Sequence, residues 1–425
     1  MKRASFLDLP SLEGAAWLAD PHLQAVFDAL GAQGGEVRIA GGAVRNALMK
    51  LPVSEIDLAT TEPPERTMVL AKSADLDVYP TGLDHGTVTV VCDFEGERRG
   101  YEVTTLRVDT RTDGRHAEVT FTADWRQDAA RRDFTINALY CARDGTVYDP
   151  LGGYGDIVAR KVRFVGDPAS RIREDSLRSL RFFRMHARYA VGRLDEEGLA
   201  ACVAEQARLE RLSGERICAE FLDLLMAPGA CGVVKTMIET AIMARILPLE
   251  ADFAALPALV DIETALARKP DGLLRLFALT PVGGPDLEKL QTRLRLSRVE
   301  TRRIAQLERL KTLTPSLPEG RRKAMLYHVG AEIFADSVVM NWARSHAAAH
   351  DKGWRALHAL GRQWRAPRFP VCAADLMARG VAAGPLLGHL LKELEEWWIA
   401  SGFHHDKESL LAQLDRIDMD RNKLS

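Results

Sequence analysis

Two carboxylates separated by one residue, Glu55 and Asp57, are the first candidates for chemistry in this chain. They lie in the stretch GGAVRNALMKLPVSEIDLAT, residues 41–60. Alternate residues of a β-strand point to the same face, so a strand here places the two carboxylates side by side. Crowded carboxylates repel one another unless a cation lies between them, and a divalent metal is the usual one. The pair therefore predicts a metal site.

Two glycines, Gly41 and Gly42, precede this pair and follow the expected strand VRIA, residues 37–40. A glycine turn into a helix presents free backbone N–H groups to an anion, and Arg45, one turn further on, can add a charged hydrogen bond. Neither a P-loop nor a dinucleotide-binding glycine pattern follows. A Gly-Gly turn alone is more often a packing turn, but beside an acidic pair it indicates nucleotidyl transfer.

A third carboxylate is expected from a neighbouring strand, and Glu102 in GYEVTTLRVD is the candidate because it lies among β-forming residues. A solvent-facing Glu on a half-exposed strand is the commoner alternative. The run RRDFTINALY begins with Arg131, Arg132 and Asp133. These three residues indicate either the start of a helix or a polar ligand, and tandem arginines at a helix start oppose its dipole and favour a bound anion.

The segment RIREDSLRSLRFFRMHAR, residues 171–188, predicts an arginine-rich helix with Asp175 and Arg178 on one face. A weak surface ion pair is the ordinary interpretation. The pair can also select a base, because a carboxylate accepts from the amino group of cytosine or adenine while a guanidinium donates to the adjacent ring nitrogen. Guanine and uracil present a carbonyl beside a ring N–H instead. Arg181 and Arg184 turn away around the helix, so the four side chains are not expected to read one base edge together.

The elements that must position these residues change character along the chain. The first part, up to about Tyr148, has short β-rich runs on both sides of a helix that begins after Pro63–Pro64. A hairpin is expected around Gly96. From about Asp167 the pattern becomes helical. The fold class is therefore α+β, a mixed sheet with helices followed by an all-helical part. Within that part, Ser297 and Glu300 predict a capping box, and Gly384–Pro385 predicts a helix start.

The composition agrees with a protein of several domains in a reducing compartment. A chain of 425 residues predicts two to four domains, and its net charge of −2 requires any nucleic acid to be held by local basic patches. Six cysteines without a C-x-x-C pair indicate reduced thiols, not a disulfide or zinc framework. We find no apolar run long enough to span a bilayer and no signal-peptide core, and we expect a cytoplasmic protein with no membrane partner.

These motifs, in this order, resemble the class II tRNA nucleotidyltransferases (CCA-adding enzymes), a branch of the polymerase-β-like nucleotidyltransferases that also includes bacterial poly(A) polymerases. The similarity is densest in the first half and extends to RLRLS and DLMARGVAAGPLLGHLLKELEEWW. The other motifs that carry it are GGAVRN, EIDLAT, HGTVTVV, YEVTTLR, DGRHAEVTFTADWRQDAARRDFTINALYC, YDPLGG, RIREDSLRSLRFFR and GERICAEFLDLL.

The resemblance implies a polymerase-β-like nucleotidyltransferase head followed by a helical neck, body and tail. We expect the head at 1–155, a neck with the nucleotide-selecting motif at 156–250, the body at 251–365 and a tRNA-binding tail at 366–425. The partners implied are the acceptor arm and 3′ end of tRNA, with ATP and CTP, and no DNA is expected. The segment from Arg111 to Glu118 corresponds to a mobile loop of the family.

The resemblance also implies roles for individual residues. Glu55 and Asp57 correspond to the ligands of Mg²⁺, and with Glu102 they form the catalytic set. The nucleotide-binding residues implied by position are Gly42, Arg45, Arg132, Asp133, Asp175, Arg178, Arg181 and Arg184. The proposed reaction is attack of the tRNA 3′-hydroxyl on the α-phosphate, which adds C, C and A in turn and releases pyrophosphate.

Two positions depart from the family pattern. The family usually has Asp at the position of Glu55, and the longer side chain predicts an altered metal preference or rate, or loss of activity. Asn46 replaces the usual Asp after Arg45, which removes one negative charge near the phosphates.

Several alternative functions remain open at this stage. The same fold and chemistry serve poly(A) polymerases, and single-nucleotide variants add only A or only CC. HGTVTVV and the tail favour the CCA-adding type. A non-catalytic tRNA-binding protein with a decayed Glu55 site is less favoured. The motif HAAAHD, from His346 to Asp351, prompts a phosphohydrolase metal site, for which an exposed helix end is the ordinary interpretation.

Basic residues in RLRLSRVETRR and WRALHALGRQWRAPR can hold RNA phosphates or lie over a helical core.

Overall fold

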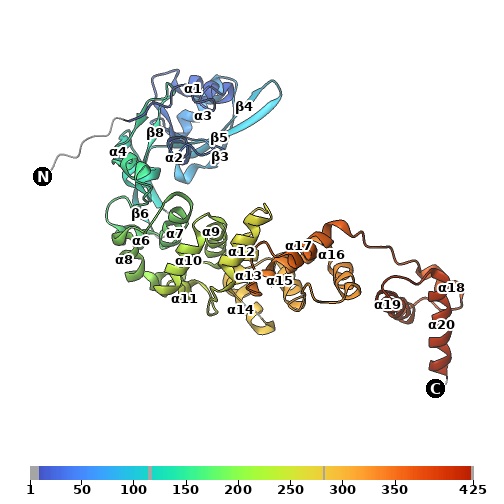
Figure 1. Cartoon of the computed structure of the whole chain (residues 1–425). Helices are drawn as coiled ribbons and strands as arrows, with labels where there is room; N and C mark the ends of the chain where they lie inside the picture. The colour runs from blue at the N-terminus through green and yellow to red at the C-terminus, as the bar shows by residue number, and fades with distance from the viewer. Residues whose placement is uncertain (1–8, 113–116, 281–282, 423–425) are drawn as a thin grey trace. The chain divides into compact units, whose positions relative to one another are not determined.

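The computed structural model describes residues 9–112, 117–280 and 283–422 (Figure 1). The chain divides into two compact units, Met1–Pro248 and Leu249–Ser425. The first unit contains all the strands of the described residues, and the second is helical.

The first part of unit 1 alternates strands with short helices. Its elements are α1 (Pro21–Gly31), β1 (Val37–Ala40), α2 (Gly42–Leu48), β2 (Asp57–Thr60), α3 (Pro64–Ser73), β3 (Asp77–Gly82), η1 (Leu83–His85), β4 (Thr87–Phe94), β5 (Glu97–Thr105), β6 (Arg107–Thr112), β7 (Ala117–Phe121), α4 (Trp125–Ala130), η2 (Thr135–Asn137), β8 (Tyr140–Cys141) and β9 (Val147–Tyr148).

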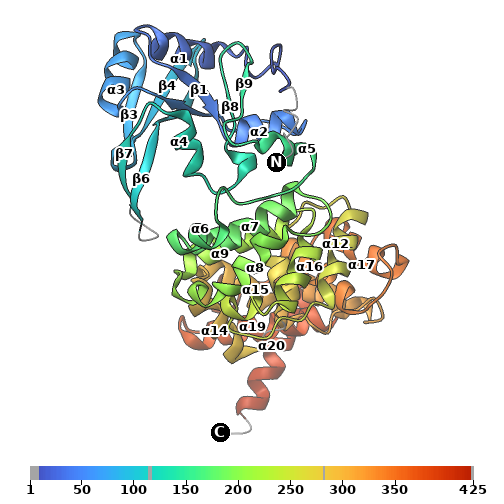
Figure 2. The ribbon, with the colours of Figure 1, turned by 90° about the vertical axis from the view of Figure 1, so that its left-hand side faces the viewer.

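A mixed sheet of seven strands forms the scaffold of this part, in the order β3-β4-β5-β2-β1-β8-β9. Strands β2 and β5 are parallel, whereas β1 pairs with β2 and β4 with β5 in antiparallel fashion. Helices α1 and α3 pack against each other and against β4 (Figure 2). The mixed sheet with helices, followed by an all-helical part, confirms the predicted α+β fold class.

Two local predictions for the sheet are confirmed. The strand at 37–40 is β1. The hairpin joins β4 to β5, with Glu95 and Gly96 both at positive φ, 54° and 83°. Two consecutive residues of positive φ match the right-handed twist of the strands that they connect.

A two-stranded ribbon of β6 and β7 follows the sheet and pairs Thr112 with Ala117. The segment 111–118 was expected to be a mobile loop. Its ends belong to these two strands, and residues 113–116 lie outside the described part of the chain.

The second part of unit 1 is helical. Its elements are α5 (Gly153–Val158), α6 (Pro168–Glu174), α7 (Leu177–Tyr189), α8 (Glu196–Ala204), η3 (Gln206–Arg211), α9 (Gly214–Met226), α10 (Ala230–Glu239) and α11 (Met243–Ile246). Helix α7 packs against α9 and α10. The apolar face of α9 is buried, as Ile217, Phe221, Leu224 and Leu225 are 0% exposed.

The single helix expected over 171–188 is wrong in one respect, because it breaks at Asp175. The backbone there is extended (φ −149°, ψ 109°), and it separates α6 from α7. The Asp175 side chain accepts a hydrogen bond from the Leu177 N–H at 3.1 Å. Such a local side-chain bond to the backbone competes with helix continuation, so the chain restarts as α7.

Unit 2 consists of helices. They are α12 (Ala255–Ala265), α13 (Gly272–Leu279), α14 (Gly284–Leu294), α15 (Arg298–Arg309), α16 (Glu319–Arg344), α17 (Lys352–Gln363), α18 (Ala373–Ala378), α19 (Pro385–Ala400) and α20 (Lys407–Asn422). The Ser297–Glu300 capping box is present at the start of α15. Helix α19 begins at Pro385 as predicted, and α16 is kinked at Gly330 (φ 79°).

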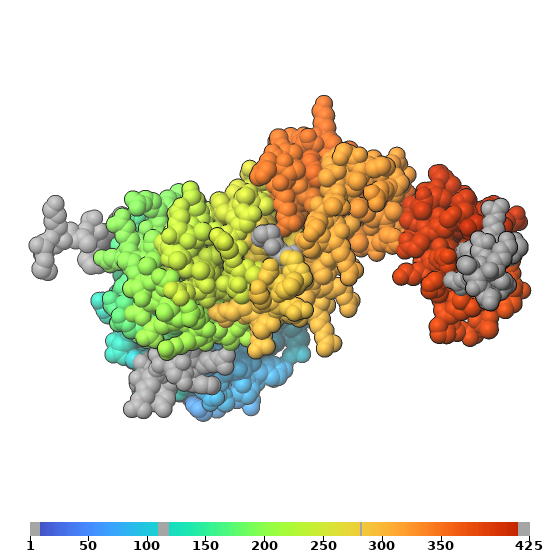
Figure 3. All heavy atoms as spheres, turned by 90° about the horizontal axis from the view of Figure 1, so that it is seen from below, coloured from blue at the N-terminus to red at the C-terminus, as the bar shows by residue number. Residues whose placement is uncertain are grey.

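The C-terminal lobe, which we define by the core residues from Val371 to Leu414 in unit 2, contains a small apolar core (red in Figure 3). Tyr327 of α16 packs against this core, and its hydroxyl donates to Glu395 at 2.6 Å. The fully or nearly buried members of the core are Val371, Leu376, Leu390, Leu394, Trp398, Ile399, Leu410 and Leu414.

Among the helices of the described residues, none combines the length and apolar character needed to cross a membrane.

Candidate active site

A cavity of about 490 Å³ lies in unit 1 beside the glycine turn. It is strongly cationic, because seven arginines and three aspartates are among its lining residues. The lining comprises Ala40, Gly41, Gly42, Arg45, Asp57, Arg131, Arg132, Asp133, Asn137, Asp175, Leu177, Arg178, Arg181, Arg184, Met185, Tyr189 and Arg216. Every predicted nucleotide-binding residue is in this set, together with Asp57.

Asp57 is the first residue of β2 and lines the cavity. Leu58 pairs with Val103 of the parallel strand β5, so continuing the register by one residue brings Asp57 beside Glu102. The pKa of Asp57 is raised, first by desolvation of its carboxylate and then by the negative charges of Glu102 and Glu55, although Arg132 opposes the shift. The negative charges of Glu102 and Glu55 therefore both act on Asp57.

The position of Glu55 corrects one part of the prediction. Glu55 is exposed and lies in the segment before β2, which has no regular secondary structure, so the alternation of a strand does not place it beside Asp57. Across residues 9–112, 117–280 and 283–422, no three His, Cys, Asp or Glu side chains are grouped to hold a metal ion. A Mg²⁺ ion usually takes one or two carboxylates and completes its shell with water and substrate phosphates. Two carboxylates beside a cationic cavity fit such an ion.

The glycine turn brings the backbone close to the cavity. Gly41 has φ 66° and ψ −112°, a conformation that side chains disfavour. A Cβ atom there would lie 3.0 Å from Arg132 Nη1. Helix α2 begins at Gly42, as predicted.

Arg45 is buried in the cavity wall, and groups of the protein use most of its donors. Its Nε and Nη2 donate to Asn46 Oδ1 at 3.1 and 2.9 Å, and Nη2 also donates to the Tyr189 hydroxyl at 2.8 Å. Nη1 donates to Asn137 Oδ1. Burial lowers the pKa of Arg45. The predicted contact between Arg45 and a triphosphate is thus limited to its remaining Nη1 donor.

The run Arg131-Arg132-Asp133 does not begin a helix. Arg131 is the C-cap of α4, where its positive charge agrees with the helix dipole, so the argument from an opposed dipole was wrong. Buried Asp128 accepts from Arg131 Nε at 2.9 Å, from Arg132 Nη2 at 3.1 Å and from the Tyr140 hydroxyl at 2.6 Å. Burial tends to raise the pKa of Asp128, but the two arginines lower it overall. Asp128 therefore holds both arginines at the cavity.

Asp133 connects the sheet part of unit 1 to helix α7. It accepts from Asn137 Nδ2 at 3.1 Å and from Arg181 Nε at 2.8 Å. Burial tends to raise the pKa of Asp133, but Arg181 and the hydrogen bonds lower it overall. On the same helix, Arg184 pairs with buried Glu220. Arg181 and Arg184 thus reach the cavity while anchored to acidic side chains.

Asp175 and Arg178 both line the cavity, but the expected ion pair between them is absent from the described contacts. Asp175 Oδ2 accepts from Arg216 Nη2 of α9 at 2.7 Å. Arg178 Nη1 donates to Glu174 and to the Arg171 carbonyl. Helix α7 starts anew after Asp175. Four side chains that were expected to diverge around one helix therefore all line one cavity, namely those of Asp175, Arg178, Arg181 and Arg184.

Sequence reasoning missed the residues that hold the arginines and aspartates in place. Asp128 precedes Arg131 and Arg132 by three and four residues, a helical spacing that could have revealed it. Arg216 lies 41 residues from its partner Asp175, and no local pattern connects them.

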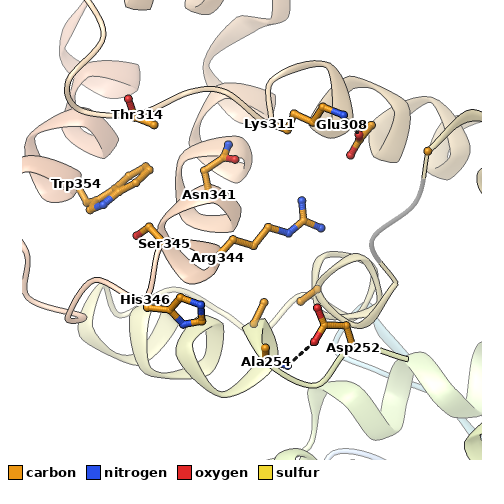
Figure 4. A pocket seen from close by; sticks show the side chains of 13 residues that line it. Asp252, Ala254, Glu308, Lys311, Thr314, Asn341, Arg344, Ser345, His346 and Trp354 are labelled. Carbon is orange, nitrogen blue, oxygen red and sulfur yellow. Dashed lines mark hydrogen bonds and ion pairs between the residues drawn. The ribbon is translucent and has the colours of Figure 1, made fainter. Parts of the chain in front are cut away.

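A second cavity of about 650 Å³ lies in unit 2 (Figure 4). Arg344 points into it, but its Nη2 donates to the Phe277 carbonyl at 3.1 Å and its guanidinium lies 4.5 Å from the Phe277 ring centroid. Lys311 pairs with Glu308 at 2.8 Å. These cations are therefore engaged by the protein itself.

His346, which also lines this cavity, bears on the proposed phosphohydrolase motif. Helix α16 ends at Arg344, so His346 and His350 lie in turns and do not share a helix face. Within the part of the chain that the structure describes, no three His, Cys, Asp or Glu side chains are grouped to hold a metal ion at this motif.

The sheet with an acidic strand end beside a cationic cavity defines a nucleotidyltransferase head. Residues 37–163 match the family described as "Poly A polymerase head domain", and residues 193–253 match "Probable RNA and SrmB- binding site of polymerase A". Enzymes of this class generally use a divalent metal.

Relatives and solved structures agree over nearly the whole chain. "CCA tRNA nucleotidyltransferase 1, mitochondrial" of Danio rerio is 36% identical over 400 residues, covering 90% of this chain and 87% of the relative. The "CCA-adding enzyme" of Limosilactobacillus fermentum is 30% identical over 390 residues, covering 89% of this chain and 92% of the relative. The chain therefore belongs to the family of CCA tRNA nucleotidyltransferases, or CCA-adding enzymes.

The fold agrees with the crystal structure of the Bacillus stearothermophilus CCA-adding enzyme in complex with CTP. The TM-score is 0.74 at 24% identity, and the match covers 95% of this chain and all of that structure's chain.

Proposed function

We propose that this protein adds C, C and A to the 3′ end of tRNA from CTP and ATP without a nucleic-acid template. The observation that carries the proposal is the cationic cavity in which Asp57 faces seven arginines. A triphosphate is highly anionic, so a cavity rich in arginine suits its binding. A carboxylate beside the triphosphate would repel it unless a cation lies between them, as the reaction requires. The substrates follow from the family to which the chain belongs.

Glu55 and Asp57 are the proposed ligands of Mg²⁺, with Glu102 nearby. The raised pKa of Asp57 supports this assignment, because a bound cation relieves the repulsion from Glu102 and Glu55. When bound, the ion supplies Lewis-acid stabilisation of the charge on the reacting phosphate. The 3′-oxygen of the tRNA attacks the α-phosphorus, the bond to the β-phosphate oxygen breaks, and pyrophosphate leaves. Glu102 is the carboxylate that we propose accepts the proton of the 3′-hydroxyl.

The arginines of the cavity are the proposed nucleotide ligands. The backbone at Gly42 and the side chains of Arg45 and Arg132 approach the triphosphate, and Asp133 approaches the ribose. Arg181 and Arg184 hold the nucleotide from α7. Asp128, Asp133 and Glu220 fix these arginines before substrate arrives, which lowers the entropy cost of binding.

Asp175 and Arg178 are the proposed base-reading pair. Asp175 accepts from the amino group of cytosine or adenine, and Arg178 donates to the adjacent ring nitrogen. Within the described contacts, Arg178 uses only Nη1 toward protein groups, so Nε and Nη2 can donate to a base. Arg216 Nη2 donates to Asp175 Oδ2 and thereby fixes the direction of the Asp175 side chain.

The remaining assignments concern the parts of the chain and its location. We propose that residues 1–155 form the catalytic head, 156–250 the neck, 251–365 the body and 366–425 a tail that binds the tRNA. We also propose a cytoplasmic location, supported by six free cysteines, which suit a reducing compartment. The relatives named mitochondrial make fractionation of the source cell the direct test.

The proposal is tested with tRNA that lacks its terminal CCA. Incubation with CTP alone is expected to add two residues, ATP alone none, and the mixture three. Addition of A only, or of CC only, would identify a partial enzyme. A long A tail would identify a poly(A) polymerase, which the description of the matched head family also admits.

A non-catalytic tRNA-binding protein is the alternative if Glu55 prevents metal binding. Incorporation is therefore measured across Mg²⁺ and Mn²⁺ concentrations alongside tRNA binding. Binding of tRNA without incorporation in either metal would favour this alternative.

A further inference from the structure

We propose that Asn46 is a positioning residue that ties Arg45 to the segment carrying Glu55, an inference that rests on the proposed function. Asn46 is half-buried on α2 and uses both ends of its amide. Its Oδ1 accepts from Arg45 Nε and Nη2 at 3.1 and 2.9 Å. Its Nδ2 donates to the Pro52 carbonyl at 3.0 Å.

The segment that Asn46 holds connects α2 to β2. Residues 51–56 form neither helix nor strand, and they carry Glu55 toward Asp57. The Asn46 backbone carbonyl also accepts from the Leu51 N–H at 2.8 Å. One residue thus fixes two consecutive positions at the start of this segment. A side chain that only accepts hydrogen bonds would keep Arg45 but release Pro52.

The same contacts continue beyond Arg45 into the nucleotide-binding part of the cavity. Arg45 donates to Asn137 Oδ1, and Asn137 Nδ2 donates to Asp133 at 3.1 Å. Asp133 in turn accepts from Arg181 of α7. An unbroken chain of hydrogen bonds therefore runs from the Pro52 carbonyl, three residues before Glu55, to the helix that carries the base-reading Arg178. Asn46 sets the separation between the metal ligand and the nucleotide site.

The first variant is Asn46→Asp, which keeps the size and the two acceptor bonds, loses the donor to Pro52 and restores the negative charge that is usual in the family. Asn46→Ala loses the same donor without adding a charge, so a metal requirement that rises in both variants is due to the lost bond to Pro52. We expect the Mg²⁺ concentration for half-maximal incorporation to rise about threefold to tenfold, the range for loss of one hydrogen bond. Mn²⁺ binding, followed by electron paramagnetic resonance without turnover, should weaken by the same factor. Asn46→Ala, which loses both contacts, should also raise the KM for CTP.

Gln24 provides a matched control in the same unit. It too is half-buried, donates its amide to a backbone carbonyl (Leu18, 2.7 Å) and accepts from an arginine, Arg143. Gln24→Glu makes the same chemical change outside the cavity, so it should lower the melting temperature comparably and leave Mn²⁺ binding unchanged.

The outcomes separate this inference from the function on which it rests. An inactive wild-type protein would overturn the proposed function. An active wild-type protein whose Asn46→Asp variant binds Mn²⁺ and requires Mg²⁺ as before would overturn the positioning role. If Asn46→Asp does not fold, the same titrations of Asn46→Ala decide, and an unchanged metal requirement there also overturns it.

Discussion

Replacing Glu102 by Gln should make the metal-free protein more stable while it damages catalysis. Glu102 of β5 lies beside Asp57 of β2 by the register of two parallel strands, and its charge contributes to the raised pKa of Asp57. Neighbouring strands are about 4.8 Å apart. Because Glu102 is exposed, the dielectric constant of water applies, and two unit charges about 5 Å apart repel by roughly 0.8 kcal/mol. Removing one of them should raise the melting temperature by about 2 °C.

The assay is calorimetric unfolding in the presence of a chelator at pH 7.5, paired with incorporation into tRNA. An acid whose pKa is raised on folding costs stability as pH rises above its unfolded pKa. The gain from Glu102→Gln should therefore be present at neutral pH and disappear as the pH falls through the raised pKa of Asp57, because the protonated carboxyl no longer repels Glu102. It should also shrink in high salt. Incorporation should fall by about 100-fold or more if Glu102 accepts the proton.

Glu97 supplies the control because it is an exposed Glu of the same strand that pairs with Arg99 at 2.8 Å. Glu97→Gln removes an attraction and should not stabilise the protein. If Glu102→Gln leaves the melting temperature unchanged or lowers it at neutral pH, the argument that the carboxylates crowd one another is wrong.

Three further substitutions test other parts of the site. Arg216→Ala should free Asp175 and reduce the discrimination against GTP and UTP by about tenfold, measured as misincorporation, with the metal requirement unchanged. Asp128→Asn should leave two arginines without their buried counter-charge and lower the free energy of unfolding by about 3 kcal/mol in urea titration. Glu55→Asp should change the ratio of Mg²⁺- to Mn²⁺-supported rates by severalfold, because the carboxylate moves back by one methylene. Unchanged misincorporation would contradict the prediction for Arg216, unchanged stability the prediction for Asp128, and an unchanged ratio of rates the prediction for Glu55.

Local signals in the sequence predicted local structure well. The capping box of Ser297 and Glu300 needs only residues three apart, and the hairpin at Gly96 needs only a turn between two β-forming runs. Both are confirmed because their determining contacts lie within a few residues. Every residue predicted to bind the nucleotide lines the cationic cavity of unit 1, and its role in binding stays a prediction.

The errors arose where distant partners decide the structure. The helix over 171–188 was expected to be continuous, but Asp175 bonds to Leu177 locally and to Arg216, 41 residues away. Arg181 finds Asp133 across 48 residues. The spacing of residues along the sequence indicates a single helix, but it does not show which distant residues will form ion pairs with that helix. The contacts that arrange the predicted site residues could therefore be seen only in the folded structure.

The C-terminal lobe has a consequence for how its role can be studied. Its apolar core is completed by Tyr327, which belongs to the kinked helix α16 and contacts Trp398 edge-on, with ring centroids 5.9 Å apart. Truncating the chain before residue 366 would uncover this face of α16, and exposed aromatic surface promotes aggregation. A shortened protein would thus lose solubility together with any RNA contact. Charge reversals at solvent-facing lobe residues, which leave the shared core intact, can separate these two effects.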